Sequence, residues 1–141
     1  MIVIDKFRGP FRFLSNFYAS PIEYEGYEYP TAEHAYQAQK TIDKAERTNI
    51  RNAPFPAMAK KLGRRCTLRS DWEKVKTPLM WEIVRAKFLQ NPKLKRKLVN
   101  TGDAKLIEEN TWGDTFWGTC NGVGENRLGI ILMTIRTELK E

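Results

Sequence analysis

Two acidic residues lie where a carboxylate could take part in chemistry. Glu33 is at the predicted start of a helix, and Asp114 lies in a glycine-rich loop between Trp112 and Trp117. Unpaired amides at a helix start stabilise a carboxylate, whereas flanking indole rings make the surroundings of the second acid apolar. Hydrolysis of a glycosidic bond uses two carboxyl groups in different environments, one to support charge on the sugar and one to transfer protons. This hypothesis requires that Glu33 and Asp114 share one cleft, which their spacing alone does not establish.

Gln37 and Lys40 follow Glu33 at helical spacing, so an acid and an amine lie on one face of the predicted helix. An ordinary exposed ladder of ion pairs has the same spacing. The segment 29–40 is, however, rich in small and aromatic residues, which is unusual for a solvated helix. Both interpretations stay open at this point: an exposed ion pair or part of a site.

A second segment, 7–18, carries five aromatic residues among its 12 residues. These rings either belong to the core or flank a flat ligand, with Ser15 and Asn16 as the polar groups that orient it.

Motifs typical of other reaction classes are missing from the sequence. It contains no Gly-x-Ser-x-Gly elbow, no phosphate-binding Gly-x-x-x-x-Gly-Lys-Ser/Thr loop and no dinucleotide-binding Gly-x-Gly-x-x-Gly after a strand. The single histidine, His34, and two cysteines, Cys66 and Cys120, supply neither a zinc quartet nor a disulfide framework. We expect a reduced, cytoplasmic protein in which His34 packs beside the site rather than acting as a lone base.

The elements that must position these residues are mostly helical. Thr31 predicts the N-cap of a helix that runs to Lys40, because its hydroxyl can accept a hydrogen bond from a first-turn amide. Alternation over 22–29 around a Glu-Gly pair predicts a β-hairpin before that helix, and Asn126 is expected to cap the last helix. Further helices are predicted over 44–52, 56–62, 77–90, 92–101 and 127–139. We expect a mainly α fold: a single compact helical domain over 1–141 with a small β-hairpin or sheet.

Glycine and proline set the expected boundaries of these elements. Gly9 and Pro10 are expected to exclude a helix where they stand, and Gly63 is expected to cap the helix over 56–62. Ser70 has the spacing of a capping box for a brief turn, after which Pro78 predicts the first residue of a separate helix.

Length and charge narrow the choice of partner. The 141 residues suffice for one domain, and no apolar run approaches the 18 residues of a membrane span, so we expect a soluble chain with no membrane partner. The formal net charge of +7, with basic clusters at 60–69 and 93–97, favours phosphate groups as partners, although it also serves solubility.

The sequence resembles the NADAR family, also called YbiA-like. The matching blocks follow one another in order and span nearly the whole chain: 13–18, 29–40, 62–64 with 69–72, 86–88, 101–103, and 114–118 continuing to 126–129. The resemblance implies a mainly α fold and N-glycosidase activity that needs no metal and no cofactor. The sequence departs from the family at Cys120, where a glycine is usual, and at Pro78, which interrupts a segment that the family continues.

The resemblance and the residue patterns together give the candidate site. The candidate catalytic residues are Glu33, Lys40 and Asp114. The candidate substrate-binding residues are Asn16, Trp72, Trp117, Gly118 and Asn126.

The resemblance also implies the class of substrate. Family members are thought to cleave the bond between ribose and nitrogen in ribosylamino pyrimidines of the riboflavin pathway, or to remove ADP-ribose from the amino group of guanine. The expected partner is a phosphorylated ribosyl or ADP-ribosyl small molecule, with ADP-ribosylated nucleic acid and an ADP-ribosyltransferase toxin as further candidates. The competing hypotheses are a non-catalytic module that binds ADP-ribose or NAD, and a basic structural protein on nucleic acid.

Overall fold

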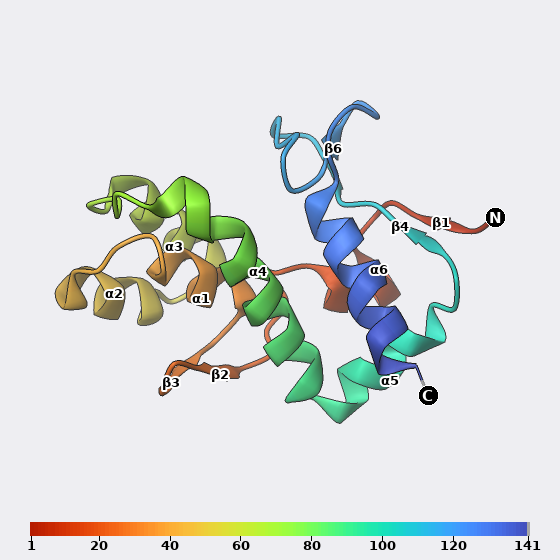
Figure 1. Cartoon of the computed structure of the whole chain (residues 1–141), viewed down its shortest axis with the longest axis horizontal. Helices are drawn as coiled ribbons and strands as arrows, with labels where there is room; N and C mark the ends of the chain where they lie inside the picture. Colours follow the sequence, from red (N-terminus) through yellow and green to blue (C-terminus); the bar gives the residue numbers. More distant parts are fainter. Residues whose placement is uncertain (141) are drawn as a thin grey trace. The chain divides into compact units, whose positions relative to one another are not determined.

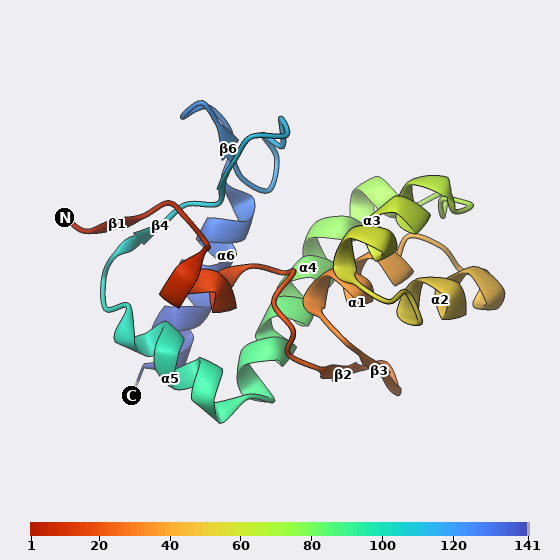
Figure 2. The same ribbon diagram turned by 180° about the vertical axis from the view of Figure 1, so that it is seen from behind.

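The chain forms two compact units. The computed structural model describes residues 1–140. The central unit is Asn16–Gln90, and the terminal unit combines Met1–Ser15 with Asn91–Glu141 (Figure 1; Figure 2). The described residues form six α-helices, one 3-10 helix and three two-stranded sheets, which confirms the predicted mainly α class.

The central unit begins with the predicted hairpin. Strands β2 (Ile22–Tyr24) and β3 (Tyr27–Tyr29) pair antiparallel, with Ile22 opposite Tyr29. Glu25 and Gly26 between them have φ angles of 51° and 85°. Positive φ at both central residues matches the right-handed twist of the two strands.

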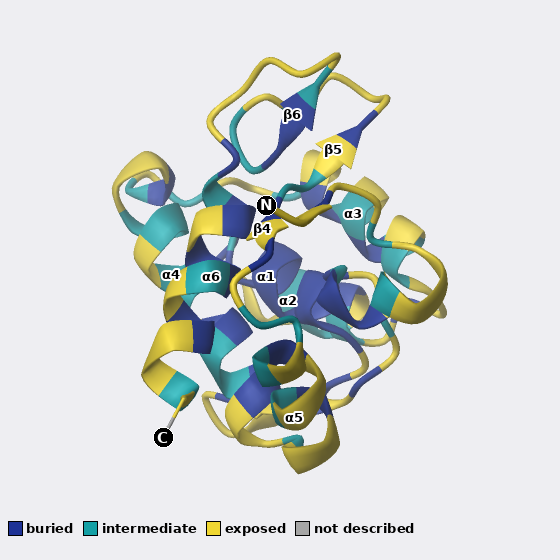
Figure 3. Ribbon diagram, turned by 90° about the vertical axis from the view of Figure 1, so that its right-hand side faces the viewer, coloured by how far each residue is buried: buried dark blue, intermediate teal, exposed yellow. Residues whose placement is uncertain are grey.

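Helix α1 (Ala32–Ala38) follows the hairpin and is buried on every side (Figure 3). Thr31 caps it as predicted, since its Oγ1 accepts a hydrogen bond of 3.1 Å from the amide of His34. Helix α1 packs against α2 (Lys44–Arg51), α3 (Pro56–Arg65) and α4 (Trp72–Leu89). Because every residue of α1 is buried, the interpretation of its polar face as an exposed ladder of ion pairs is wrong.

Three predictions about helix ends in the central unit are wrong. Gly63 does not end α3, which continues through it to Arg65, because Gly63 keeps helical geometry and faces a side chain of α1. Pro78 does not start a new helix, since α4 runs without interruption from Trp72 to Leu89. Pro78 is exposed, and buried residues before and after it, such as Trp72 and Met80, hold both halves of α4 in place. No side chain caps α4, so the expected capping box is not formed.

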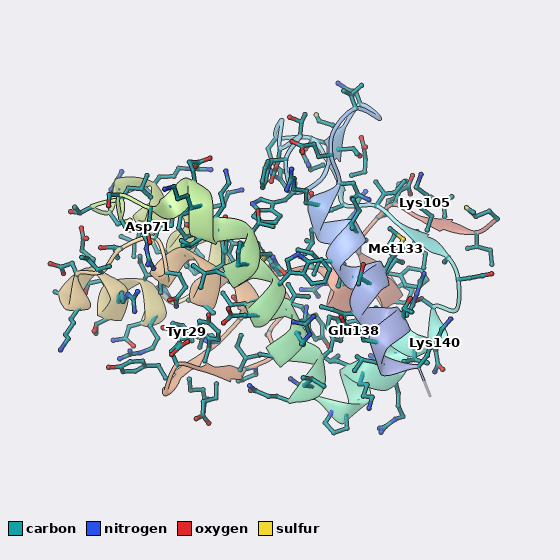
Figure 4. All side chains as sticks on the ribbon, in the orientation of Figure 1. Tyr29, Asp71, Lys105, Met133, Glu138 and Lys140 are labelled. Carbon is teal, nitrogen blue, oxygen red and sulfur yellow. The ribbon has the colours of Figure 1, made fainter. Side chains whose placement is uncertain are left out.

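The terminal unit is built around a helix pair and short parallel strands. Strand β1 (Val3–Ile4) pairs with β4 (Lys105–Leu106), and β5 (Glu109–Asn110) pairs with β6 (Thr119–Cys120). Helix α5 (Pro92–Asn100) packs against α6 (Arg127–Leu139), which also covers β4. Met133 of α6, labelled in Figure 4, accepts a 3.5 Å contact at its sulfur from the amide of Leu106.

The segment Gly9–Leu14 forms a 3-10 helix, η1, so the expectation that Gly9 and Pro10 exclude a helix there is wrong. Pro10 occupies the first turn, where proline has no amide to lose and its fixed φ suits a helix, so it begins this element instead of breaking it.

The two cysteines are free thiols, Cys66 in the central unit and Cys120 in the terminal unit. Among residues 1–140, no helix is both long and apolar enough to cross a membrane.

Candidate active site

Glu33 is a buried carboxylate at the first turn of α1, with 8% of the residue exposed. Its amide donates a 3.0 Å hydrogen bond to the carbonyl of Asn16, which joins the segment after η1 to the start of the helix. Its Oε2 accepts a 2.6 Å hydrogen bond from Nε2 of Gln37, one turn further along α1. The position at a helix start favours the negative charge, and the Gln37 amide fixes the direction of one oxygen.

Lys40 lies in the turn directly after α1, two residues beyond the end of the helix. Its amide donates to the Gln37 carbonyl at 3.1 Å, and its Nζ lies 6.0 Å from the ring centroid of Trp72. Burial lowers the pKa of Lys40; the nearby charges of Glu33 and Cys66 act against this shift, and those of Arg64 and Lys60 act with it. A lowered pKa increases the neutral fraction of the amine, which is its nucleophilic form.

Trp72, the first residue of α4, covers Lys40 from the side of that helix. Its ring lies 5.2 Å from the ring of Tyr36 with a 54° tilt, and only 6% of the residue is exposed. The indole therefore helps to keep water away from the Lys40 amine.

Asn16 is a buried carboxamide with an unused acceptor. Its Nδ2 contacts the sulfur of Met80 at 3.4 Å, and its Oδ1 has no hydrogen-bond partner although the residue is 8% exposed. Thioether sulfur is a weak acceptor, and buried carbonyl oxygens are rarely left without a donor. Such an oxygen suits a donor group on a ligand.

His34 makes hydrogen bonds with both ring nitrogens. Its Nε2 lies 3.0 Å from the Ala53 carbonyl, which can only accept, so Nε2 carries the proton. Its Nδ1 then accepts from the Thr31 hydroxyl at 2.8 Å. Burial lowers the pKa of His34, and this neutral ring joins the start of α1 to Ala53, two residues beyond the end of α2.

Asp114 belongs to the loop between β5 and β6 and is held rigidly there. Its Oδ1 accepts hydrogen bonds from the amides of Phe116 and Trp117, at 3.1 and 2.9 Å. The Asn110 side chain makes two hydrogen bonds with the backbone of Asp114: it accepts from the amide at 3.0 Å and donates to the carbonyl at 2.8 Å. Oδ2 is the oxygen that these contacts leave for other partners.

Gly118 and Asn126 shape the backbone of the terminal unit. A Cβ at Gly118 would lie 2.0 Å from the Glu108 carbonyl oxygen, so only glycine fits there. Asn126, at φ 50°, accepts from the Glu108 amide and donates to the Leu106 carbonyl, both at 2.9 Å. The expected side-chain cap of α6 is therefore not made, because both ends of the Asn126 carboxamide bind other backbone groups.

The candidate residues fall into two groups, one in each unit. The central unit brings together Asn16, Glu33, Lys40 and Trp72. The terminal unit carries Asp114, Trp117, Gly118 and Asn126 on one stretch of chain, with the Trp117 ring edge-on to Phe116 at 4.8 Å. That Glu33 and Asp114 share one cleft stays a prediction.

Gln37 is not among the residues predicted for the site, although its position four residues after Glu33 indicates that the two side chains can meet on one face of a helix. In the described part of the chain, no group of three His, Cys, Asp or Glu side chains could hold a metal ion.

Comparison with known proteins gives the class of this protein. N-glycosidase YbiA of Shigella flexneri is 44% identical over 128 residues, which cover 89% of this chain and 79% of the relative. An N-glycosidase of Nostoc punctiforme is 41% identical over 137 residues, covering 93% and 87%. These relatives support a glycosyl hydrolase that acts as an N-glycosidase.

The family follows from the domain match and the fold. The NADAR domain model matches residues 5–140, and the chain therefore belongs to the NADAR family. The NMR structure of the Escherichia coli protein YbiA superposes with a TM-score of 0.86 at 40% identity, covering 98% of this chain and 83% of that one. A riboflavin biosynthesis protein of Vibrio vulnificus is 42% identical over 132 residues, which are 92% of this chain and 36% of the relative.

Proposed function

We propose that the chain hydrolyses the C1′–N bond between a ribose and the exocyclic amine of a nucleobase-like heterocycle. The observation that carries this proposal is the placement of Lys40, an amine with a lowered pKa, beside Trp72 and within the field of the buried Glu33. A neutral amine can add to an opened sugar, and a buried carboxylate can transfer protons. The N-glycosidase names of the relatives support the same chemistry.

A covalent route uses both residues. The lone pair of the exocyclic nitrogen forms a C1′=N bond as O4′ leaves, and the N–H proton moves to O4′, which gives an open-chain imine. The Lys40 amine adds to C1′, the carboxylate of Glu33 carries the two Nζ protons in turn to the heterocycle nitrogen, and the bond from C1′ to that nitrogen breaks, so that a C1′=Nζ bond forms and the heterocycle departs as its free amine. Water then adds to C1′, Glu33 carries the two water protons in turn to Nζ, and the C1′–Nζ bond breaks, which releases the open-chain sugar as an aldehyde and restores the Lys40 amine.

A direct route needs no covalent step. In it, Glu33 takes a proton from the water that attacks C1′, Asp114 stabilises positive charge on the sugar, and the C1′–N bond breaks as the leaving nitrogen receives that proton from Glu33. Borohydride added during turnover distinguishes the two, because only the covalent route leaves a reduced adduct on Lys40 that mass spectrometry can locate. Turnover without such an adduct favours the direct route, and chain treated with borohydride without substrate is the control.

The substrate is either guanine that carries ADP-ribose on its amino group, free or in nucleic acid, or a ribosylamino pyrimidine phosphate of the riboflavin pathway. The net charge of +7 and the proximity of Lys60 and Arg64 to Lys40 support a phosphorylated substrate. Incubation with each substrate type under identical conditions, followed by mass spectrometry of the products, tests the choice. Release of the free heterocyclic amine from one of them supports the proposal, and no release from either contradicts it.

The second candidate function is a module that binds ADP-ribose without cleaving it. The unpartnered Oδ1 of Asn16 favours ligand binding of either kind. Calorimetry with ADP-ribose, combined with product analysis on ADP-ribosylated guanine, separates the two functions. Binding without product would support the module.

A further inference from the structure

The Gln37 side chain has one strong hydrogen bond, and that bond goes to Glu33. Its Nε2 lies 2.6 Å from Glu33 Oε2, the residue is 3% exposed, and its Oε1 has no hydrogen-bond partner. The reverse orientation of the amide would put two oxygens 2.6 Å apart, so the contact with Glu33 decides which way the amide points. A buried amide that leaves its own oxygen unpaired is held in place by this bond and by packing.

The packing comes from Gly63 on α3. A Cβ built on Gly63 would lie 2.0 Å from Gln37 Oε1, 2.9 Å from its Cδ and 3.3 Å from its Cβ. The Gln37 amide therefore occupies the space that a side chain at this position of α3 would take. Ala59, one turn earlier on α3, is 0% exposed, so this face of the helix is made of small residues where α1 packs against it.

We propose that Gln37 is a positioning residue that holds the Glu33 carboxylate in its reactive orientation. Gly63 is required at its position because any side chain there would overlap the Gln37 amide. This inference rests on the proposed function, in which Glu33 transfers protons. A methyl group on Gly63 displaces the Gln37 amide, and the 2.6 Å hydrogen bond that fixes the direction of Glu33 Oε2 is lost.

A double-mutant cycle measures this connection. Gly63→Ala and Gln37→Ala are each expected to lower kcat roughly 10- to 100-fold, the range in which small misplacements of catalytic groups act. In Gln37→Ala the amide that a methyl group on Gly63 would displace is already absent. The double variant is therefore expected to match Gln37→Ala in kcat within about twofold. Effects that multiply in the double variant would overturn the inference.

Two further Gln37 variants separate hydrogen bonding from packing. Gln37→Met keeps the length of the side chain and its packing on α3 but removes the donor, so kcat is expected to fall while thermal stability is retained. Gln37→Glu places a second carboxyl group against Glu33, and the two must share a proton. The acidic limb of its kcat profile is expected to move up by about one pH unit or more, because the shared proton must be lost before Glu33 can accept another. Full kcat in Gln37→Met, or lower kcat without a shift in Gln37→Glu, would contradict positioning.

Ala57→Gly is the matched control on α3, because Ala57 is exposed and lies away from Gly63. The substitution exchanges alanine and glycine on the same helix and changes its helix propensity without touching Gln37. We therefore expect kcat to stay unchanged in this variant. The wild-type chain is assayed first. Absence of turnover there contradicts the proposed function itself, whereas turnover with a multiplicative cycle contradicts only the role of Gln37 and Gly63.

Discussion

Glu33 and Asp114 are held in opposite ways. Oε2 of Glu33 accepts a hydrogen bond from the Gln37 side chain, whereas Oδ1 of Asp114 accepts two from backbone amides. A side-chain donor can be removed or moved by one substitution, but backbone donors stay with the loop. The orientation of Glu33 is therefore the more easily altered of the two.

Glu33→Gln is expected to lower kcat by a factor on the order of 100 or more, because the amide cannot transfer a proton, while substrate affinity is retained. Steady-state kinetics and calorimetry with the substrate measure the two quantities. Glu28→Gln, an exposed change on β3, is the control and should leave both unchanged. Full turnover in Glu33→Gln would remove Glu33 from the mechanism.

Trp72→Ala is expected to raise the pKa of Lys40, because water then reaches the amine and the main cause of its lowered pKa is burial. The alkaline pH at which the amine becomes neutral moves up, so activity at neutral pH falls and is partly recovered at higher pH. The pH profile of kcat checks this. Trp81→Ala on the same helix, whose ring faces Arg85 instead, is the control.

Lys87 offers a stability test outside the proposed chemistry. Burial lowers its pKa to about 7, so between pH 7 and its ordinary value the unfolded chain binds a proton that the folded chain does not. Stability should thus rise with pH over this window, by at most about 1.4 kcal/mol per pH unit. Urea unfolding at pH 7 and 8 measures the rise, below the ordinary pKa values of Cys66 and Tyr24, above which their raised pKa values act in the opposite direction. Lys87→Met should be more stable at pH 7 and lose the Lys87 part of the slope; an unchanged slope would contradict this account.

At the scale of elements, caps, turn residues and helix starts were predicted correctly where they depend on residues close in sequence. The Thr31 cap, the Glu25-Gly26 turn and the helices from Lys44 and Pro92 each depend on hydrogen bonds or backbone angles within a few residues, and all are found. Gly63 and Pro78 failed as helix ends because contacts distant in sequence decide their roles.

The candidate site follows the same division. The spacing of Glu33, Gln37 and Lys40 indicated that they could act together, but not that the helix is buried on all sides. The two hydrogen bonds of Asn126 to Glu108 and Leu106 could not be predicted from its neighbours in sequence. Asparagine is equally suited to cap a helix and to bind backbone groups of a distant segment.

Asn126→Ala is expected to destabilise the terminal unit by about 2 to 3 kcal/mol, since it leaves two backbone groups unpaired and puts alanine at positive φ. Asn121, also at positive φ (53°) but exposed, is the matched control. Asn121→Ala should lose only the conformational part, about 1 kcal/mol. Chemical unfolding of both variants measures the two losses in free energy of unfolding. Equal losses would contradict a stabilising role for the hydrogen bonds of the Asn126 side chain.

At the scale of the whole molecule, the NADAR match spans residues of both units. The cycle of Glu33→Gln, Asp114→Asn and the double variant tests whether the two acids serve one reaction. Residues that act in the same step are strongly non-additive, so the double variant is expected to lose little more kcat than the worse single variant. Losses that multiply would indicate that Asp114 acts independently of the step that needs Glu33.

The free thiols Cys66 and Cys120 provide two natural attachment sites for a distance measurement. Each unit carries one of them, and both are partly accessible, so a nitroxide spin label can be attached to each without any substitution. The raised pKa of Cys66 calls for labelling at mildly alkaline pH, where more of its thiolate forms. Pulsed electron paramagnetic resonance on the doubly labelled chain would then report the distance between the two labels in frozen solution, and measuring it with and without substrate would show whether ligand binding changes that distance.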